Sequence, residues 1–111
     1  MPMNNQMDIN TLLEYVCKEL RKRRKDKKLT LDDVGFDLGY NSSYIGKIER
    51  AEQRTISFYM LVTLANYYDV KIETVISLAR LQYNIDQQES LEKEKQKQQE
   101  AERKKAEDDN Q

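Results

Sequence analysis

The sequence has 111 residues, of which 38% are hydrophobic and 35% are charged, and its net charge is −1. This length fits one small domain with an appendage. Three glycines and one proline are too few turn-forming residues for a many-stranded β fold, so the chain is expected to be all-α. With no histidine and one cysteine, a disulfide within the chain and Cys/His zinc sites are excluded, and neither a metal nor a cofactor is expected.

The charge is unevenly distributed along the chain. Residues 1–81 carry 13 basic and 11 acidic residues, whereas residues 82–111 carry 6 basic and 9 acidic residues. A basic surface on the first part is therefore compatible with the overall acidic balance. No apolar run approaches the ~20 residues of a membrane span, and the N-terminus lacks a signal-peptide pattern, so a cytoplasmic protein without a membrane partner is expected.

The first predicted helix follows a flexible N-terminus at residues 1–9 and spans residues 11–25. Asn10 is expected to cap it, because asparagine accepts a hydrogen bond from the first helical amides. One apolar stripe recurs at helical spacing and continues into an arginine: Leu13, Val16, Cys17, Leu20 and Arg24. On this stripe Cys17 is expected to be a small buried hydrophobe.

Two short helices follow, separated by Gly39. Thr30 is expected to cap a helix that ends at Gly39, with Asp33 completing a capping box. Gly39 supplies the left-handed residue that ends this helix and makes the turn. Either Asn41 or Ser42 is expected to cap the next helix, at about residues 42–50. The inward residues of the two helices are Val34, Leu38, Ile45 and Ile48.

A fourth helix, at residues 58–68, is expected to begin after Ser57, and a fifth begins near residue 72. The predicted buried residues of the fourth helix are Phe58, Leu61, Val62, Ala65 and Tyr68. Those of the fifth are Ile72, Val75, Ile76, Leu78 and Ala79. The charged tail at residues 82–111 is rich in Glu, Gln and Lys, so it is either a helical extension of the fifth helix or disordered. It lacks the apolar heptads of a coiled coil.

Residues 29–50, L-T-L-D-D-V-G-F-D-L-G-Y-N-S-S-Y-I-G-K-I-E-R, resemble the helix-turn-helix of the phage repressor and Cro (XRE-like) family. The resemblance rests on coupled positions: small Gly35 where two helices cross, Gly39 in the turn, and inward Ile45 and Ile48. It extends over roughly residues 12–80 and implies a five-helix repressor-like domain at residues 10–81. Members commonly pair an arginine of the first helix with a glutamate ending the third. The matching residues are Arg24 and Glu49.

The resemblance further implies that the third helix enters the major groove of double-stranded DNA. The matching base-contacting candidates are Asn41, Ser42, Ser43 and Lys47, although helix capping equally explains the first three. The candidates for backbone contacts are Thr30, Tyr44, Arg50 and Arg54. Three departures from the family pattern are Leu31, where glutamine is frequent, Gly46, where a larger polar residue is usual, and Ile56, where proline is frequent.

The leading interpretation is a sequence-specific DNA-binding transcriptional regulator, in the first instance a repressor. It is expected to be a homodimer through the fifth helix, with Leu78, Leu81 and Ile85 in the interface. The alternative is a protein-interaction module with the same fold that does not read DNA, such as an antirepressor, an antitoxin-like partner or a conjugation accessory factor. An enzyme is not expected, because no residues stand at catalytic spacing.

Overall fold

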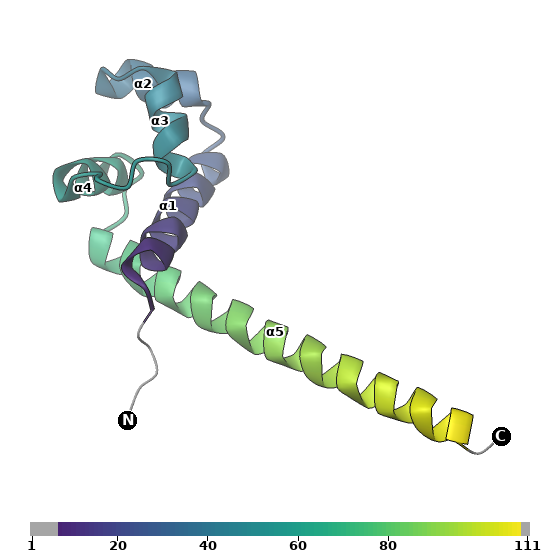
Figure 1. Ribbon diagram of the computed structural model, residues 1–111. Helices are drawn as coiled ribbons and strands as arrows, with labels where there is room; N and C mark the ends of the chain where they lie inside the picture. Colours follow the sequence, from purple (N-terminus) through teal and green to yellow (C-terminus); the bar gives the residue numbers. More distant parts are fainter. Residues whose placement is uncertain (1–6, 110–111) are drawn as a thin grey trace. The chain divides into compact units, whose positions relative to one another are not determined.

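The computed structural model describes residues 7–109 and contains five helices. The predicted all-α fold is confirmed, and no strand occurs within the described range. The chain divides into two compact units, one ending at Leu81 and one beginning at Gln82. The helices are α1 (Ile9–Asp26), α2 (Leu31–Leu38), α3 (Ser42–Glu49), α4 (Phe58–Tyr67) and α5 (Ile72–Asp109), shown in Figure 1.

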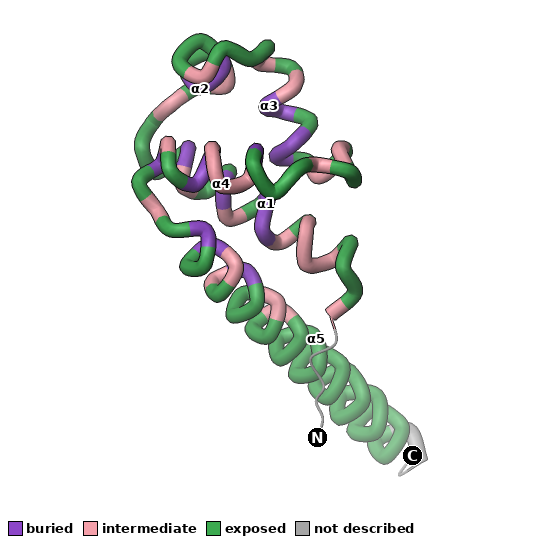
Figure 2. Tube along the Cα trace, turned by 90° about the vertical axis from the view of Figure 1, so that its left-hand side faces the viewer, coloured by how far each residue is buried: buried purple, intermediate pink, exposed green. Residues whose placement is uncertain are grey.

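The core of the first unit is an apolar cluster to which all five helices contribute (Figure 2). Burying a side chain the size of leucine or isoleucine contributes about 2 kcal/mol, so this cluster provides the main stabilisation of the short helices α2 and α3. Helix α3 packs against α2 and α1. The buried apolar residues are Val16, Cys17, Leu20, Val34, Ile45, Ile48, Met60, Leu64, Ala65, Tyr68, Ile72, Val75 and Ala79.

Helix α1 begins earlier than the sequence predicted. Its N-cap is Asp8, whose side chain accepts a hydrogen bond from the backbone N–H of Asn10 at 3.4 Å. The prediction that Asn10 caps the helix was therefore wrong. Aspartate caps helices as well as asparagine does, so the two residues cannot be ranked by type. Of the N-terminal segment predicted to be flexible, residues 1–6 lie outside the described residues.

The buried face of α4 also differs from the predicted one. Met60 and Leu64 are buried, whereas Phe58 is 64% exposed and Leu61 and Val62 are half-buried. The prediction that Phe58 is buried was wrong, because α4 is apolar almost throughout and its first residues give no contrast from which to read the helical phase. The predicted Ser57 cap is confirmed, since its hydroxyl accepts from the N–H of Met60 at 3.1 Å.

The second unit consists of the residues of α5 from Gln82 onward. Nearly all of its described side chains are exposed, and Gln82 donates a hydrogen bond to Asp86 at 2.9 Å, one helical turn away. The helical alternative for this segment is therefore the one observed, consistent with its content of good helix formers. Across the described part of the chain, no helix has the length and apolar character needed to cross a membrane.

Candidate nucleic-acid interface

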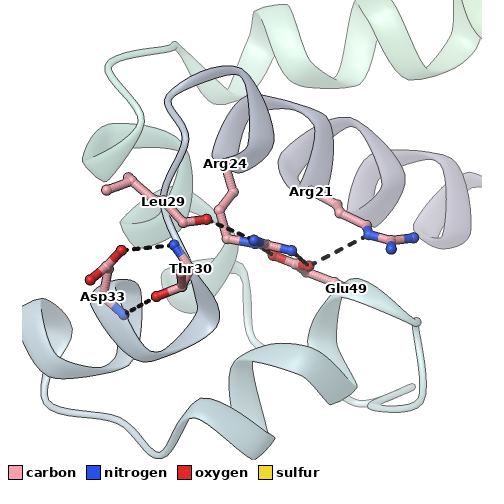
Figure 3. Close-up of polar contacts among 6 residues, drawn as sticks. All are labelled: Arg21, Arg24, Leu29, Thr30, Asp33 and Glu49. Atoms are coloured by element: carbon pink, nitrogen blue, oxygen red, sulfur yellow. Dashed lines mark hydrogen bonds and ion pairs between the residues drawn. The ribbon is translucent and has the colours of Figure 1, made fainter.

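The first turn of α2 is fixed by a reciprocal pair of hydrogen bonds between Thr30 and Asp33 (Figure 3). The backbone N–H of Thr30 donates to Asp33 Oδ2 at 2.8 Å, and the backbone N–H of Asp33 donates to Thr30 Oγ1 at 3.0 Å. This is the predicted capping box. The hydrogen bond from the Thr30 backbone is the main cause that lowers the pKa of the Asp33 carboxyl. Thr30 itself is exposed at the helix start.

The turn between α2 and α3 depends on two glycines. Gly39 adopts a left-handed conformation with φ of 79°, and its N–H donates to the carbonyl of Gly35 at 2.8 Å. The N–H of Tyr40 donates to the same carbonyl at 2.8 Å. A Cβ at Gly35 would lie 2.5 Å from the backbone oxygen of Tyr40, so no larger residue fits while the chain turns here.

Helix α3 buries one face and exposes the other. Ile45 and Ile48 are fully buried, whereas Ser43 and Lys47 are exposed. Asn41 is the N-cap, because its side-chain oxygen accepts from the backbone N–H of Ser43 at 2.8 Å. Ser42, the alternative cap, is instead the first residue of the helix and is half-buried.

Tyr44 is also half-buried, and its ring lies 5.5 Å from that of Tyr40, measured between centroids. The pair joins the residue after Gly39 to the first turn of α3, so the Tyr44 side chain is held by a packed ring.

The last turn of α3 is joined to α1 by a bidentate ion pair (Figure 3). Arg24 Nε and Nη2 donate to the two carboxylate oxygens of Glu49 at 2.7 Å and 2.9 Å. Arg24 Nη1 also donates to the carbonyl of Leu29 at 2.8 Å, which ties the α1–α2 connection to the same group. Arg21 lies at the rim, 3.9 Å from Glu49. The hydrogen bonds with Glu49 raise the pKa of the Arg24 guanidinium.

The basic run at residues 21–25 is consequently less available to a partner than its sequence suggests. Arg24 is buried in the pair with Glu49, and Arg23 donates to Glu19 at 2.9 Å within α1. Arg21, Lys22 and Lys25 remain exposed. The positive field of the run therefore comes from three side chains rather than five.

Two arginines follow the same, C-terminal end of α3. Arg50 is the C-cap, and its Nε and Nη2 each lie 3.2 Å from a carboxylate oxygen of Glu52. Arg54 is exposed in the segment that leads to α4. The pair with Arg50 lowers the pKa of the Glu52 carboxyl. Arg50 therefore stands at the C-terminal end of α3, where a cation suits the helix dipole.

One contact of this region was not predicted. The hydroxyl of Tyr67 on α4 donates to Asp37 Oδ2 on α2 at 2.5 Å, and this bond raises the pKa of Tyr67 to about 12. The two residues are 30 positions apart, and neither lies on a predicted buried stripe. Nothing in the sequence pattern distinguishes this tyrosine from the chain's six others.

Among the side chains that the structure describes, no three from His, Cys, Asp or Glu are grouped to hold a metal ion. Cys17 is buried beneath α3, and burial raises the pKa of its thiol to about 11, with a further contribution from the Glu49 carboxylate. Its position supports the prediction of a small buried hydrophobe.

A helix-turn-helix family model matches residues 20–75, which cover the end of α1, all of α2 to α4 and the start of α5. No curated protein matches the chain. The matched segment contains the capping box, the glycine turn and the Arg24–Glu49 pair described above. The chain therefore belongs to the XRE-type helix-turn-helix family, whose members are DNA-binding transcription regulators.

Proposed function

We propose that the protein is a sequence-specific transcriptional repressor of the phage repressor and Cro type that inserts α3 into the major groove of double-stranded DNA as a homodimer. The observation that carries the proposal is the division of α3 into two faces. Ile45, Ile48 and Glu49 anchor one face, while Ser43 and Lys47 are exposed on the other. A helix held in this way can enter a groove without disturbing its packing.

In this proposal the base contacts come from Asn41, Ser42, Ser43 and Lys47. Lysine can donate to the acceptors of guanine, and asparagine can pair with adenine. The side chain of Asn41 already accepts from the N–H of Ser43, so its amide nitrogen is the group directed to a base. The short serine side chains allow the helix backbone to come close to the base edges.

The proposed backbone contacts flank these residues. Thr30 stands at the N-terminus of α2, where the helix dipole favours a phosphate. Tyr44 lies in α3, and Arg50 and Arg54 follow it. Contacts of this kind set the orientation of the protein on the duplex and supply affinity that depends on salt.

The homodimer is proposed to form through the α5 region, with Leu78, Leu81 and Ile85. Leu81 is 54% exposed and Ile85 is 41% exposed, so both offer apolar surface to a second copy. One domain provides few base contacts, and a dimer would double their number. This supports binding to a DNA site with two-fold symmetry, as is usual for helix-turn-helix dimers. Sedimentation of the full chain at a range of concentrations measures this equilibrium.

Binding to a fluorescein-labelled duplex of mixed sequence, followed by anisotropy over a series of salt concentrations, tests the proposed DNA binding. The full chain is expected to bind at low salt, and its affinity should decrease with salt along a slope set by the number of phosphate contacts. If the chain binds no duplex at low salt, the proposed DNA binding fails and only the assignment of the fold stands.

A second candidate function is a protein-interaction module with the same fold. The observation that favours it is Phe36, which is 89% exposed on α2 between the exposed acidic residues Asp32 and Asp37. An exposed aromatic ring on a structured helix is typical of protein interfaces. If DNA binding fails while Phe36→Ala leaves the domain folded, this face is the next surface to test against protein partners.

A further inference from the structure

Gly46 and Leu31 are two departures from the family pattern, and they lie together beneath Arg50. A Cβ placed on Gly46 would lie 3.1 Å from Arg50 Nη1 and 3.4 Å from Leu31 Cδ1. The guanidinium of Arg50 therefore rests where most residues would carry a side chain. Its other two nitrogens, Nε and Nη2, hydrogen-bond the carboxylate of Glu52. Arg50 is thus held between α3, the start of α2 and the following loop.

This arrangement limits where the arginine can lie. Gly46 is buried because the side chains of Arg50 and Leu31 cover its backbone. An arginine on a flexible surface loses rotamer freedom when it binds a phosphate, and an arginine already held in place loses less. The exposed pair with Glu52 is weak, because both side chains are more than half accessible, so an incoming phosphate can displace the carboxylate.

We infer that Gly46 is a positioning residue for phosphate binding: because it has no side chain, it leaves the Arg50 guanidinium room to lie over α3, where it can bind a phosphate of the DNA backbone. This inference rests on the proposed function, and it adds a role for two residues that the family pattern left unexplained. Arg50 binds the phosphate, whereas Gly46 acts only through Arg50. Alanine at this helical position would favour the helix more than glycine does.

Gly46→Ala separates this role from a structural one. The nearest atoms to the added methyl group are side-chain atoms of Arg50 and Leu31, and the closer of these ends a flexible chain. The variant is therefore expected to fold and to melt at or above the wild-type temperature, because alanine is the better helix former. The added methyl group would push the guanidinium outward by a few tenths of an ångström, so binding to DNA should weaken although no charge has been removed.

The experiment measures anisotropy of a mixed-sequence fluorescein-labelled duplex with the full chain and with Gly46→Ala, Arg50→Ala and the double variant. We expect Gly46→Ala to raise Kd several-fold and to reduce the salt slope by up to about one unit, the contribution of one phosphate contact. Arg50→Ala should lose the whole contribution of this phosphate contact to affinity and salt slope. Adding Gly46→Ala to Arg50→Ala should change neither quantity further. Arg80→Ala, which removes one exposed charge elsewhere, is the matched control.

Three results would overturn the inference. The first is wild-type affinity and salt slope in Gly46→Ala, and the second is an equal further loss when Gly46→Ala is added to Arg50→Ala. The third is an unfolded Gly46→Ala, because it would mean that the methyl group displaces more than two side chains. In all three the wild-type chain still binds the duplex. If the wild-type chain itself does not bind, it is the proposed function that fails.

Discussion

Arg24 and Glu49 form a bidentate ion pair in which Nε and Nη2 of the arginine lie 2.7 Å and 2.9 Å from the two carboxylate oxygens. The side chains are only 10% and 6% exposed, so the pair is largely shielded from water. It joins the end of α1 to the end of α3 and, through the Leu29 carbonyl, holds the connection that leads into α2. The pair therefore supports the orientation of α3 together with the buried Ile45 and Ile48.

Glu49→Ala should lower the free energy of unfolding by ~3 kcal/mol, because it leaves the Arg24 guanidinium buried without its partner. Urea denaturation followed by circular dichroism measures the change. Glu14→Ala, at an exposed position of α1, is the matched control and should have little effect. A loss for Glu49→Ala no larger than that of the control would mean that the pair is solvated in solution.

Gly35→Ala should destabilise the domain by about 1–3 kcal/mol, as overpacking does in a closely packed contact. The added Cβ would meet a backbone oxygen that belongs to the turn itself, so the neighbour cannot rotate away. Gly46→Ala is the control, because the same change there meets only side chains. Gly35→Ala should lower the melting temperature, whereas Gly46→Ala should leave it unchanged or raise it. Equal shifts would contradict the close crossing of α2 and α3.

Cys17 makes stability depend on pH above the neutral range. Its pKa of about 11 in the folded protein exceeds the value of 9.0 for a solvated thiol, so the unfolded chain loses its proton first. The stabilisation is complete below about pH 9 and disappears as pH rises through about 11, with a loss on the order of 2 kcal/mol at the upper end.

Urea denaturation of the wild type and of Cys17→Ala over this pH range measures the effect, because the tyrosines and other titrating groups are common to both proteins. The difference in unfolding free energy between the two should shrink as pH rises. A difference that stays constant from about pH 8 to about pH 11 would show that the thiol is accessible to water in the folded state.

Lys47→Ala should weaken binding to the preferred duplex by about 1–3 kcal/mol, the range for a lost base contact, while the melting temperature stays close to that of the wild type. Lys47 is exposed and contributes nothing to the core, so its removal should not affect folding. Lys71→Ala removes an exposed lysine that immediately precedes α5 and serves as the control. A variant that melts early would contradict the assignment of Lys47 to the outer face.

The parts of the fold that could be predicted from the sequence are those specified by local chemistry. Thr30 and Asp33 mark a capping box, and Gly39 marks a left-handed turn, because few other residues adopt these conformations at low cost. The polar caps contrast with the apolar residues that follow, so the helix starts could be located to within about two residues. Only the first cap was misplaced, since Asp8 and Asn10 have equal capping chemistry.

The parts that could not be predicted depend on tertiary packing. Helix α4 is apolar along most of its length, so its sequence does not show which face is buried. Packing against neighbouring helices buries Met60 and leaves Phe58 exposed. The structure joins Tyr67 to Asp37 by a hydrogen bond and places Arg50 over Gly46. No sequence pattern relates the two residues of either pair. In the sequence Gly46 stands out as a poor helix former and as a departure from the family pattern, but its contact with Arg50 cannot be predicted from either.

Selection of bound duplexes from a pool of random double-stranded DNA tests the central claim most directly, since the claim is that α3 reads DNA sequence. The full chain should enrich a two-fold symmetric site whose half-sites lie about one helical turn apart, as a dimer presenting two copies of α3 requires. Lys47→Ala should relax the preference at one position of each half-site. A bound pool with the same sequence composition as the input would contradict the account.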